Sequence, residues 1–475
     1  MDLLLALLAV LLALLPSSSV AWVVGCANKP APSTLERVAA PALAIVSTFL
    51  HSNCSRLAAN FDSDILQIAT WPTFANITAA GSVTVHLTGY ALGVPMCATD
   101  PLNRLYWYNR VAGLTGHTIE METAYTRDVT MRWDPDFQPT SMVPEDYLSF
   151  LVHGAGLTFS VSGSQPRALQ TFTGRYGHFD TFESFELHQP IDRPTPFEAA
   201  LELTGCDSDY KTPPRPSLHY IVPPKGLTIV SDVDDILRQA YVWDFTKALQ
   251  YLFLIPFRPW SNMNTTFHQW ADRVPSAHFH YVTDAPETSY RKYVVGLDHF
   301  YPRGSHAFRP IDFSSLSKAM SPRYWNVRRL IETFPERRFV LIGDTATSST
   351  LSAYGRLAKE FPTQVQCIIM RNVDATEPAN WILPNLKSLP ADKLLLFNRT
   401  SELRGFTRVL PDIAAGKMTG CGGMETGLPS GKVYGWEAGI VSAYKGFRVY
   451  VACQLLSEQR PSWVYCRLDR RSLKV

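Results

Sequence analysis

Two different patterns of apolar and polar positions distinguish an earlier and a later part of the chain. In the first, short stretches alternate strictly between apolar and polar side chains, as in residues 82–90 and 154–164, and this is the period of a half-buried strand. Gly, Pro and Asp turns separate further short apolar runs at residues 106–108 and 181–187. The pattern predicts an antiparallel β-sandwich over residues 65–210, with no catalytic signature of its own.

The second pattern begins after a proline-rich linker at residues 211–216. Short continuous apolar runs follow, and they are typical of buried parallel strands. The segments between them have helical spacing at residues 325–334 and 350–361, each closed by a proline. We therefore predict a doubly wound α/β domain over residues 218–400. Its expected strands are residues 226–230, 278–282, 339–342, 365–370 and 394–397.

The amino-terminal stretch has the layout of a secretory signal peptide. Residues 3–15 are nearly all Leu, Ala and Val, and the small residues Ser19 and Ala21 suit signal peptidase. We predict that residues 1–21 are removed. The alternative is an uncleaved anchor, but its apolar run is short against the roughly 20 residues that span a bilayer. Residues 22–64 are predicted to form a helical segment, from apolar positions at helical spacing.

Sequons and cysteines agree with an oxidising compartment. Glycosylation sequons begin at Asn53, Asn76, Asn264 and Asn398. The 8 cysteines have no close metal-ligand spacing, so disulfides are expected rather than zinc. Cys367 lies in an apolar, strand-like run and is predicted to be a buried free thiol. The chain is therefore expected in the secretory pathway, as an extracellular or lumenal glycoprotein.

The amino-acid composition mainly excludes classes of protein. Hydrophobic residues make up 46% and charged residues 18% of the 475 positions, which is typical of a globular chain of two or three domains. The net charge is +2. Nucleic-acid binding requires a concentrated basic face, and none is evident, so no nucleic-acid partner is expected.

Acidic and hydroxyl side chains follow three of the predicted parallel strands. Asp232 and Asp234 follow the first, Thr283 and Asp284 the second, and Asp344 the third. Because ligands bind beyond the carboxyl ends of strands in an open α/β sheet, we expect these side chains to share one crevice. The alternative for Thr283 and Asp344 is an ordinary structural cap at the end of a strand.

The spacing of Asp232 and Asp234 suits two different roles, because alternate residues leaving a strand can point into the same crevice. Asp232 is the candidate nucleophile that attacks phosphorus and forms an aspartyl-phosphate. Asp234 is the candidate acid that protonates the leaving oxygen and then activates water. Carboxylates repel a phosphate dianion, so a hard cation such as Mg²⁺ is expected, with Asp232 and Asp344 as its carboxylate ligands.

Four blocks occur in a fixed order. They read SDVDDILR at 231–238, HYVTDAP at 280–286, YPRGS at 301–305 and FPERRFVLIGD at 334–344. Together they resemble the actin-patch-protein-type phosphatidate phosphatases of the haloacid dehalogenase superfamily, with secreted fungal-type members closest. The resemblance implies a haloacid-dehalogenase-like fold and the Mg²⁺-dependent hydrolysis of phosphatidate to diacylglycerol.

The resemblance also implies roles for individual residues. Asp234 is similar to the residue whose backbone carbonyl ligates the metal as well. Thr283 is similar to the hydroxyl residue that hydrogen-bonds the transferring phosphoryl group. Arg323 corresponds to the cation that neutralises the phosphoryl charge, with Lys318 as the second choice.

Two positions depart from the family pattern. Ile236 stands where many relatives have Thr, and Ser349 stands where relatives usually have a second Asp. The loss of that carboxylate leaves open an alternative from another class, a secreted, catalytically degenerate protein that binds an anionic ligand without turnover. A third reading is a phosphatase for a water-soluble ester.

The insertion at residues 241–274 is predicted to be a cap, and it is rich in aromatic residues such as Trp243, Phe257 and Trp260. In one reading these side chains dock at a lipid surface and bring a phosphorylated lipid to the crevice. In the other they pack inward. Residues 401–475 are a carboxy-terminal extension to which the sequence assigns no role.

Overall fold

The computed structural model describes a little over half of the chain, all within the first of its two compact units, residues 1–426 and 427–475. The predicted leader, the predicted helical segment 22–64 apart from residues 24–25, the strand at 106–108, Lys318 and the last 54 residues lie outside the described part. Residues 24–25 form a short strand. The described residues are 24–25, 66–78, 81–93, 150–161, 164–174, 177–186, 191–204, 215–253, 255–310, 321–373, 375–377 and 386–421.

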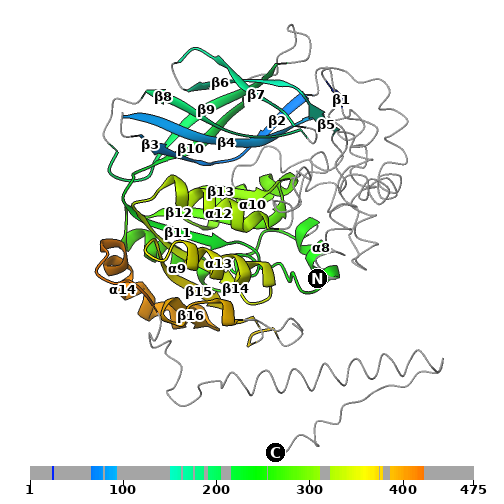
Figure 1. The fold of residues 1–475 in the computed structure, drawn as a ribbon. Helices are drawn as coiled ribbons and strands as arrows, with labels where there is room; N and C mark the ends of the chain where they lie inside the picture. The colour runs from blue at the N-terminus through cyan, green and yellow to red at the C-terminus, as the bar shows by residue number, and fades with distance from the viewer. Residues whose placement is uncertain are drawn as a thin grey trace, which may run out of the picture. The chain divides into compact units, whose positions relative to one another are not determined.

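A mostly antiparallel sheet occupies the amino-terminal part, with strand order β1-β5-β4-β3-β10-β9-β6-β7 and with β2 and β8 also paired to β4 (Figure 1). The β1–β5 and β3–β10 pairs are parallel. The strands are β1 (Val24–Gly25), β2 (Leu66–Thr70), β3 (Phe74–Ile77), β4 (Ser82–Gly93), β5 (Phe150–His153), β6 (Gly156–Val161), β7 (Arg167–Phe172), β8 (His178–Glu186), β9 (Thr195–Thr204) and β10 (Arg215–Val222).

Alternation along these strands directs one set of their side chains into a common apolar core. Val83, Val85 and Leu87 of β4 are fully buried, and Leu157 and Phe159 of β6 belong to the same cluster. The described side chains of β2–β4 and β6–β10 contribute to this cluster, and we call these strands the β-domain. Of the predicted antiparallel strands, those at 82–90, 154–164 and 181–187 are present as β4, β6 and β8, while their division into the two sheets of a sandwich stays a prediction.

A second sheet of six strands is parallel throughout, in the order β13-β12-β11-β14-β15-β16. The chain moves outward from β11 through β12 to β13 and then returns to the other side of β11 with β14. The strand order therefore reverses between β11 and β14, where ligands bind in such sheets. The strands are β11 (Gly226–Asp232), β12 (His278–Pro286), β13 (Ser305–Arg309), β14 (Arg337–Asp344), β15 (Val365–Arg371) and β16 (Leu394–Phe397).

All five predicted parallel strands are present, and β13 is an additional one. The predicted domain start, residue 218, lies inside β10, which pairs with β9 and β3. The parallel sheet itself begins at Gly226. The predicted all-parallel α/β region is thereby confirmed, and its classification as doubly wound and haloacid-dehalogenase-like stays a prediction.

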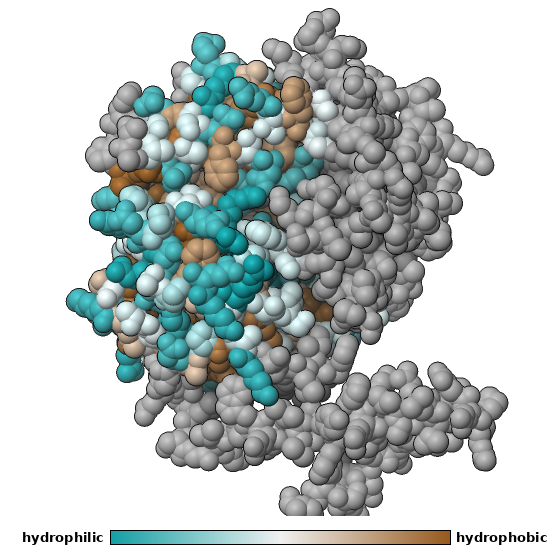
Figure 2. Space-filling model, viewed as in Figure 1, coloured by the Kyte–Doolittle hydropathy of each residue, from teal (hydrophilic) through white to brown (hydrophobic). Residues whose placement is uncertain are grey.

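Helices pack against both faces of the parallel sheet. Ile229 of β11 lies in one apolar cluster with α9, α10 and α14, and its neighbour Val230 lies in another with α12 and α13. Figure 2 shows largely hydrophilic residues on the outward side of the described helices in this view. The α-helices are α8 (Phe245–Phe253), α9 (Met263–Arg273), α10 (Tyr290–Phe300), α12 (Pro322–Thr333), α13 (Ser348–Glu360) and α14 (Arg404–Ala415), and the 3₁₀ turns are η2 (Glu287–Ser289), η3 (Leu386–Ser388), η4 (Ala391–Lys393) and η5 (Thr400–Leu403).

Three aromatic residues of the predicted cap are buried. Trp243, Phe257 and Trp260 are each at most 8% exposed. Helix α9 is part of the core between the sheet and α14, because Phe267 and Trp270 are completely buried there. This burial agrees with the inward-packing alternative for those side chains. None of the helices in the described part is sufficiently long and apolar to cross a membrane.

The prediction of a free thiol at Cys367 is wrong. Cys367 in β15 forms a disulfide with Cys421, which follows α14, and the two Cα atoms are 5.5 Å apart. An apolar run shows only that a cysteine is buried. It does not show which distant segment of chain will meet it, and here the partner lies 54 residues away.

Candidate active site

The predicted acidic residues gather where the central parallel strands end. Asp232 is the last residue of β11 and Asp344 the last of β14, the neighbouring strand. On the other side, Asp232 is in register with Val282 of β12, and Thr283 follows directly. The carboxyl-terminal parts of three neighbouring strands thus bring these side chains to the point where the strand order reverses.

Asp232 is buried and held by a two-pronged ion pair. Its Oδ2 lies 2.9 Å from Nη1 of Arg323, and its Oδ1 accepts a hydrogen bond of 3.0 Å from Nη2. The amide of Val233 also donates to Oδ1, at 2.8 Å, and Thr350 Oγ1 donates to Oδ2 at 3.4 Å. Arg323 comes from the first turn of α12 and is 3% exposed. Two residues predicted to act together are therefore in direct contact, 91 positions apart in the sequence.

Negative charge exceeds positive charge around this pair. Burial raises the pKa of Asp232 well above its usual value; Arg323 opposes the rise, but Asp344, Asp284 and Asp234 each add to it. Burial alone would lower the pKa of Arg323, and the carboxylates of Asp232 and Asp284 outweigh that effect, so its pKa is raised. One guanidinium thus serves several carboxylates, and the crevice favours a further cation.

Asp234 is fixed by groups from three elements. Thr283 Oγ1 donates a hydrogen bond of 2.7 Å to Oδ2, and the Tyr293 hydroxyl of α10 donates one of 2.8 Å to Oδ1. The Nε atom of Arg238 lies 3.4 Å from Oδ1. Thr283 Oγ1 in turn accepts the amide N–H of Ala285, as a strand-end cap would. The structure therefore joins Thr283 to Asp234, and its predicted contact with a phosphoryl group stays a prediction.

Asp344 carries one capping oxygen and one oxygen without a partner. Its Oδ1 accepts the amide N–H groups of Ala346 at 2.6 Å and Thr347 at 3.1 Å, as a structural cap would. Its Oδ2 is buried and has no hydrogen-bond partner among the described residues. Burial raises the pKa of Asp344. A buried carboxylate oxygen without a donor is costly unless a cation or proton satisfies it.

The predicted residues fit Mg²⁺ in donor type. The set consists of the carboxylates of Asp232 and Asp344 and the backbone carbonyl of Asp234, all oxygen donors, and Mg²⁺ usually retains several waters. No group of three or more His, Cys, Asp or Glu side chains within the described ranges is arranged to hold a metal ion. The predicted set, with two acidic side chains, is smaller than such a group. The unpartnered Oδ2 of Asp344 is the observation that favours a cation here.

Asp284 and Ser349 are in direct contact. Ser349 Oγ donates a hydrogen bond of 3.1 Å to Asp284 Oδ2. The same oxygen lies 3.2 Å from Nη2 of Arg323. A carboxylate at position 349 would meet the carboxylate of Asp284, whereas the serine hydroxyl donates to it. Arg323 is therefore shared between Asp232 and Asp284.

Asp235 shapes the loop that follows β11. Its φ angle of 56° lies in the left-handed region, which Asp tolerates better than most residues. Its carboxylate accepts the amide N–H groups of residues 240–242 at 2.8 to 3.0 Å. Burial and the charge of Asp344 raise its pKa to about 7. Ile236 beside it is completely buried in the apolar core, where a threonine hydroxyl would need a partner.

Sequence reasoning missed Tyr293, Arg238 and Arg371. Tyr293 lies inside a helix, so the search of strand ends could not reach it. Arg238 belongs to the first block, but its contact with Asp234 depends on the turn between them. Arg371 ends β15 and donates to the backbone carbonyl of Asp235. An inspection of every strand end would have found Arg371.

Comparison with known proteins identifies the central segment. Residues 227–372 match the family model for the catalytic domain of phosphatidate phosphatase APP1. The resemblance drawn from the four blocks is confirmed for this segment. The match covers less than half of the chain, and the β-domain lies outside it. Assignment to the haloacid dehalogenase superfamily and the likeness to secreted fungal members stay predictions.

Other comparisons give little. No curated protein matches the chain. Among solved structures, a Photobacterium sp. JT-ISH-224 2,6-sialyltransferase in complex with CMP and lactose has 9% identity and a TM-score of 0.18, over 55% of this chain and 43% of that one. A carbohydrate esterase with catalytic and non-catalytic binding functions has 7% identity and a TM-score of 0.18, over 71% and 89%. Such scores carry no argument about fold or function.

Proposed function

We propose that this protein is a Mg²⁺-dependent phosphatase that hydrolyses a phosphate monoester through an aspartyl-phosphate, with phosphatidate as the substrate and diacylglycerol as the product. The family match supports a phosphatase of the phosphatidate phosphatase type. The observation that carries the proposal is the two-pronged contact of Arg323 with Asp232, beside an Asp234 held by Thr283.

In the first half-reaction, one carboxylate oxygen of Asp232 attacks phosphorus and the bond from phosphorus to the ester oxygen breaks. The leaving oxygen takes a proton from Asp234, whose carboxyl group Thr283 and Tyr293 orient. Arg323 neutralises charge on the phosphoryl oxygens. In the second half-reaction, Asp234 removes a proton from water, which attacks phosphorus and releases phosphate from Asp232.

Mg²⁺, when bound to Asp232, Asp344 and the carbonyl of Asp234, would offset the repulsion between carboxylates and the phosphate dianion. The chain's own residues supply the remaining steps. Asp344 Oδ2 is the atom that most needs such a cation, because it is buried without a partner among the described residues.

The proposed setting is the secretory pathway, outside the cell or in a lumen. The leader-like residues 1–21 and the four sequons motivate this assignment. The Cys367–Cys421 disulfide supports it, because disulfides persist in oxidising compartments. A lipid substrate also requires contact with a membrane surface, and we propose that residues 241–274 make this contact. Trp243, Phe257 and Trp260 do not support this part of the proposal, because they are buried.

The experiment is phosphate release by the mature chain with Mg²⁺, from phosphatidate in detergent micelles and from glycerol phosphate. Asp232→Asn should lower the rate by on the order of 10³-fold or more, because it removes the nucleophile. Asp272→Asn is the matched control, since Asp272 is an exposed aspartate on α9. Equal rates for wild type and Asp232→Asn would refute the proposal that the protein is a phosphatase. A preference for glycerol phosphate would refute the proposal that its substrate is a lipid.

A second candidate is a protein that binds an anionic ligand without turnover. The observation in its favour is the contact among Ser349, Asp284 and Arg323, at a position where the resemblance drawn from the four blocks implies a second Asp. This candidate requires inorganic phosphate to bind and Arg323→Gln to abolish binding, with no phosphate release from either substrate. Measured turnover that depends on Asp232 would eliminate it.

A further inference from the structure

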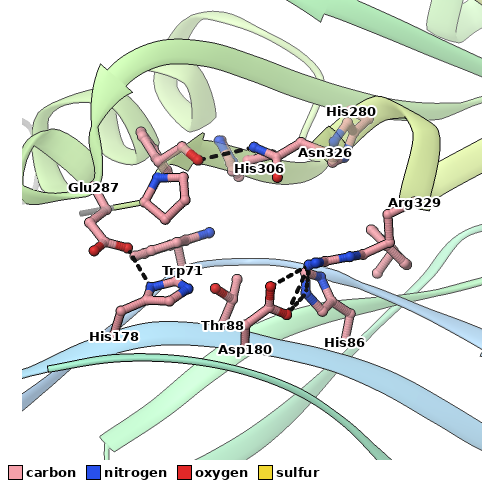
Figure 3. Close-up of a pocket in the computed structure, with 14 residues that line it drawn as sticks. Trp71, His86, Thr88, His178, Asp180, His280, Glu287, His306, Asn326 and Arg329 are labelled. Atoms are coloured by element: carbon pink, nitrogen blue, oxygen red, sulfur yellow. Dashed lines mark hydrogen bonds and ion pairs between the residues drawn. The ribbon is translucent and has the colours of Figure 1, made fainter. Parts of the chain in front are cut away.

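A narrow pocket lies between the β-domain and the parallel-sheet region, away from the candidate active site. Its lining contains none of Asp232, Asp234, Thr283, Arg323 or Asp344. Its cavity volume is about 30 Å³, which accommodates one or two waters and no substrate. Figure 3 shows that charged side chains meet across this pocket from both sides. We call this contact the seam.

The first seam contact holds α12. Nη1 of Arg329 lies 2.8 Å from Oδ1 and 2.6 Å from Oδ2 of Asp180, which belongs to β8. His86 Nε2 of β4 lies 2.8 Å from the same Asp180 Oδ1. Arg329 and Arg323 are both on α12. The first turn of this helix therefore contacts Asp232, and its middle contacts the β-domain.

The second seam contact holds the end of β12. Nδ1 of His178 lies 2.9 Å from Oε2 of Glu287, whose side chain is completely buried. Glu287 begins η2 directly after Pro286, the last residue of the strand that carries Thr283 and Asp284. A buried carboxylate is costly without a partner, so this contact constrains where the strand can end.

Both seam contacts originate from one strand. His178 and Asp180 are two positions apart on β8 and point to the same side of it, while Phe179 between them points into the β-domain core. The strand pairs with β4 along nine residues, Tyr90 through Ser82. The pair is therefore presented by a rigid sheet rather than by a loop.

We propose that His178 and Asp180 of β8 are positioning residues for the proposed phosphatase reaction. Through Arg329 they fix α12 and hence Arg323 against Asp232. Through Glu287 they fix the end of β12 and hence Thr283 against Asp234. The β-domain thus sets the geometry of the active site without touching the substrate. The inference rests on the proposed function, but its structural half can be measured without turnover.

The matched control is an ion pair on the same strand. Glu183 of β8 lies 3.1 Å from Arg167 of β7, within the β-domain and without contact to the parallel-sheet region. Asp180→Ala and Glu183→Ala each remove one carboxylate from β8, so they share any general cost to the β-domain. They differ in whether the lost partner carries an active-site element.

The first measurement is steady-state hydrolysis of a water-soluble aryl phosphate by the full mature chain with Mg²⁺. Asp180→Ala and His178→Ala should each lower kcat by about tenfold to a hundredfold with KM within about threefold, because small displacements of a catalytic group are costly. His178→Asn should recover most of the rate, since its amide nitrogen can occupy the position of Nδ1. Glu183→Ala should stay within about twofold of wild type.

The second measurement is hydrogen exchange, which requires no activity. Asp180→Ala should speed amide exchange in α12, and His178→Ala in residues 286–289, at temperatures where both variants remain folded, while Glu183→Ala should change neither. Unchanged exchange and unchanged kcat in the seam variants would overturn the inference. So would equal losses in Glu183→Ala. If wild type and Asp232→Asn proved equally inactive, the proposed function would be refuted. The hydrogen-exchange result alone would then show whether the seam contacts hold α12 and residues 286–289 in place.

Discussion

The candidate active site and the seam both pair acidic side chains with basic ones, but they do so differently. In the seam each carboxylate has at least one basic partner, Arg329 and His86 for Asp180 and His178 for Glu287. In the crevice Arg323 is shared by Asp232 and Asp284, and Asp344 Oδ2 has no partner among the described residues. A carboxylate with a partner within the protein can serve as a structural contact, whereas buried carboxylates that share or lack a partner are typical of a site that binds another group.

The largest of these effects is expected from removing Arg323, the only cationic side chain among the described residues that forms an ion pair with Asp232. Arg323→Gln should lower kcat/KM by about 10²- to 10³-fold, as expected for the loss of a donor that stabilises developing charge. Arg323→Lys should retain part of the rate, because it keeps the charge but loses the two-pronged geometry. Steady-state kinetics with a soluble phosphate monoester tests this, and a loss of twofold or less in Arg323→Gln would contradict the assigned role.

The second prediction concerns the pH dependence of the unfolding free energy, to which the seam and the candidate active site contribute with opposite sign. His280 lines the seam pocket, and burial lowers its pKa to about 3. The unfolded state then binds more protons than the folded state between about pH 6.5 and 3, so stability falls as pH falls through that window. His280→Asn should remove about 2 kcal/mol of the difference between the unfolding free energies at pH 7 and pH 5.

Asp235 in the crevice acts in the opposite direction. Its pKa of about 7 in the folded state exceeds its ordinary value of 3.8, so the folded state binds the extra proton and stability falls as pH rises between these values. Urea titrations of wild type and His280→Asn at pH 5 and pH 7 measure the seam contribution, because Asp235 is common to both proteins. An identical pH dependence in the two would contradict a neutral, buried His280.

A smaller effect is expected at Tyr293. Tyr293→Phe removes the hydrogen bond that the hydroxyl donates to Asp234 and leaves the ring in place. We expect a loss of about tenfold in kcat, since a hydrogen bond to a charged group contributes about 1.5 kcal/mol or slightly more. Tyr290→Phe, on the same helix, is the control. An unchanged kcat would mean that Thr283 alone suffices to orient Asp234.

The smallest effect tests the shared guanidinium. Asp284→Asn should leave Arg323 with one carboxylate fewer and so strengthen binding of inorganic phosphate about fivefold, because a like charge is removed from the anion's surroundings. Isothermal titration of phosphate into the two proteins measures this change. Weaker phosphate binding in Asp284→Asn would show that Asp284 supports phosphate binding by helping to hold the proposed Mg²⁺, rather than competing with phosphate for Arg323.

The sequence predicted the parts of this comparison that depend on local pattern. Short apolar runs predicted the parallel strands, and the residues after them included Asp232, Thr283 and Asp344, because the ends of parallel strands meet at one edge of a sheet. The resemblance implied a cation ahead of the last block, and Arg323, the first choice for it, lies far from Asp232 in sequence but in contact with it.

The remainder depends on pairing between distant segments. The contacts of Glu287 with His178 and of Arg329 with Asp180 join residues more than a hundred positions apart. No periodicity in either segment encodes such a partner. For the same reason an apolar run revealed the burial of Cys367 but not its disulfide with Cys421. Tyr293 was missed because a helix interior gives no sign of which strand end its side chain will face.

The central claim is that Asp232 is the nucleophile of a phosphatase. Rapid acid quenching of the mature chain during turnover of a phosphorylated substrate with Mg²⁺, followed by peptide mass spectrometry, tests it most directly. We expect one phosphoryl group on the peptide that contains Asp232, and none in Asp232→Asn. Turnover without that adduct, or an adduct that persists in Asp232→Asn, would contradict the claim.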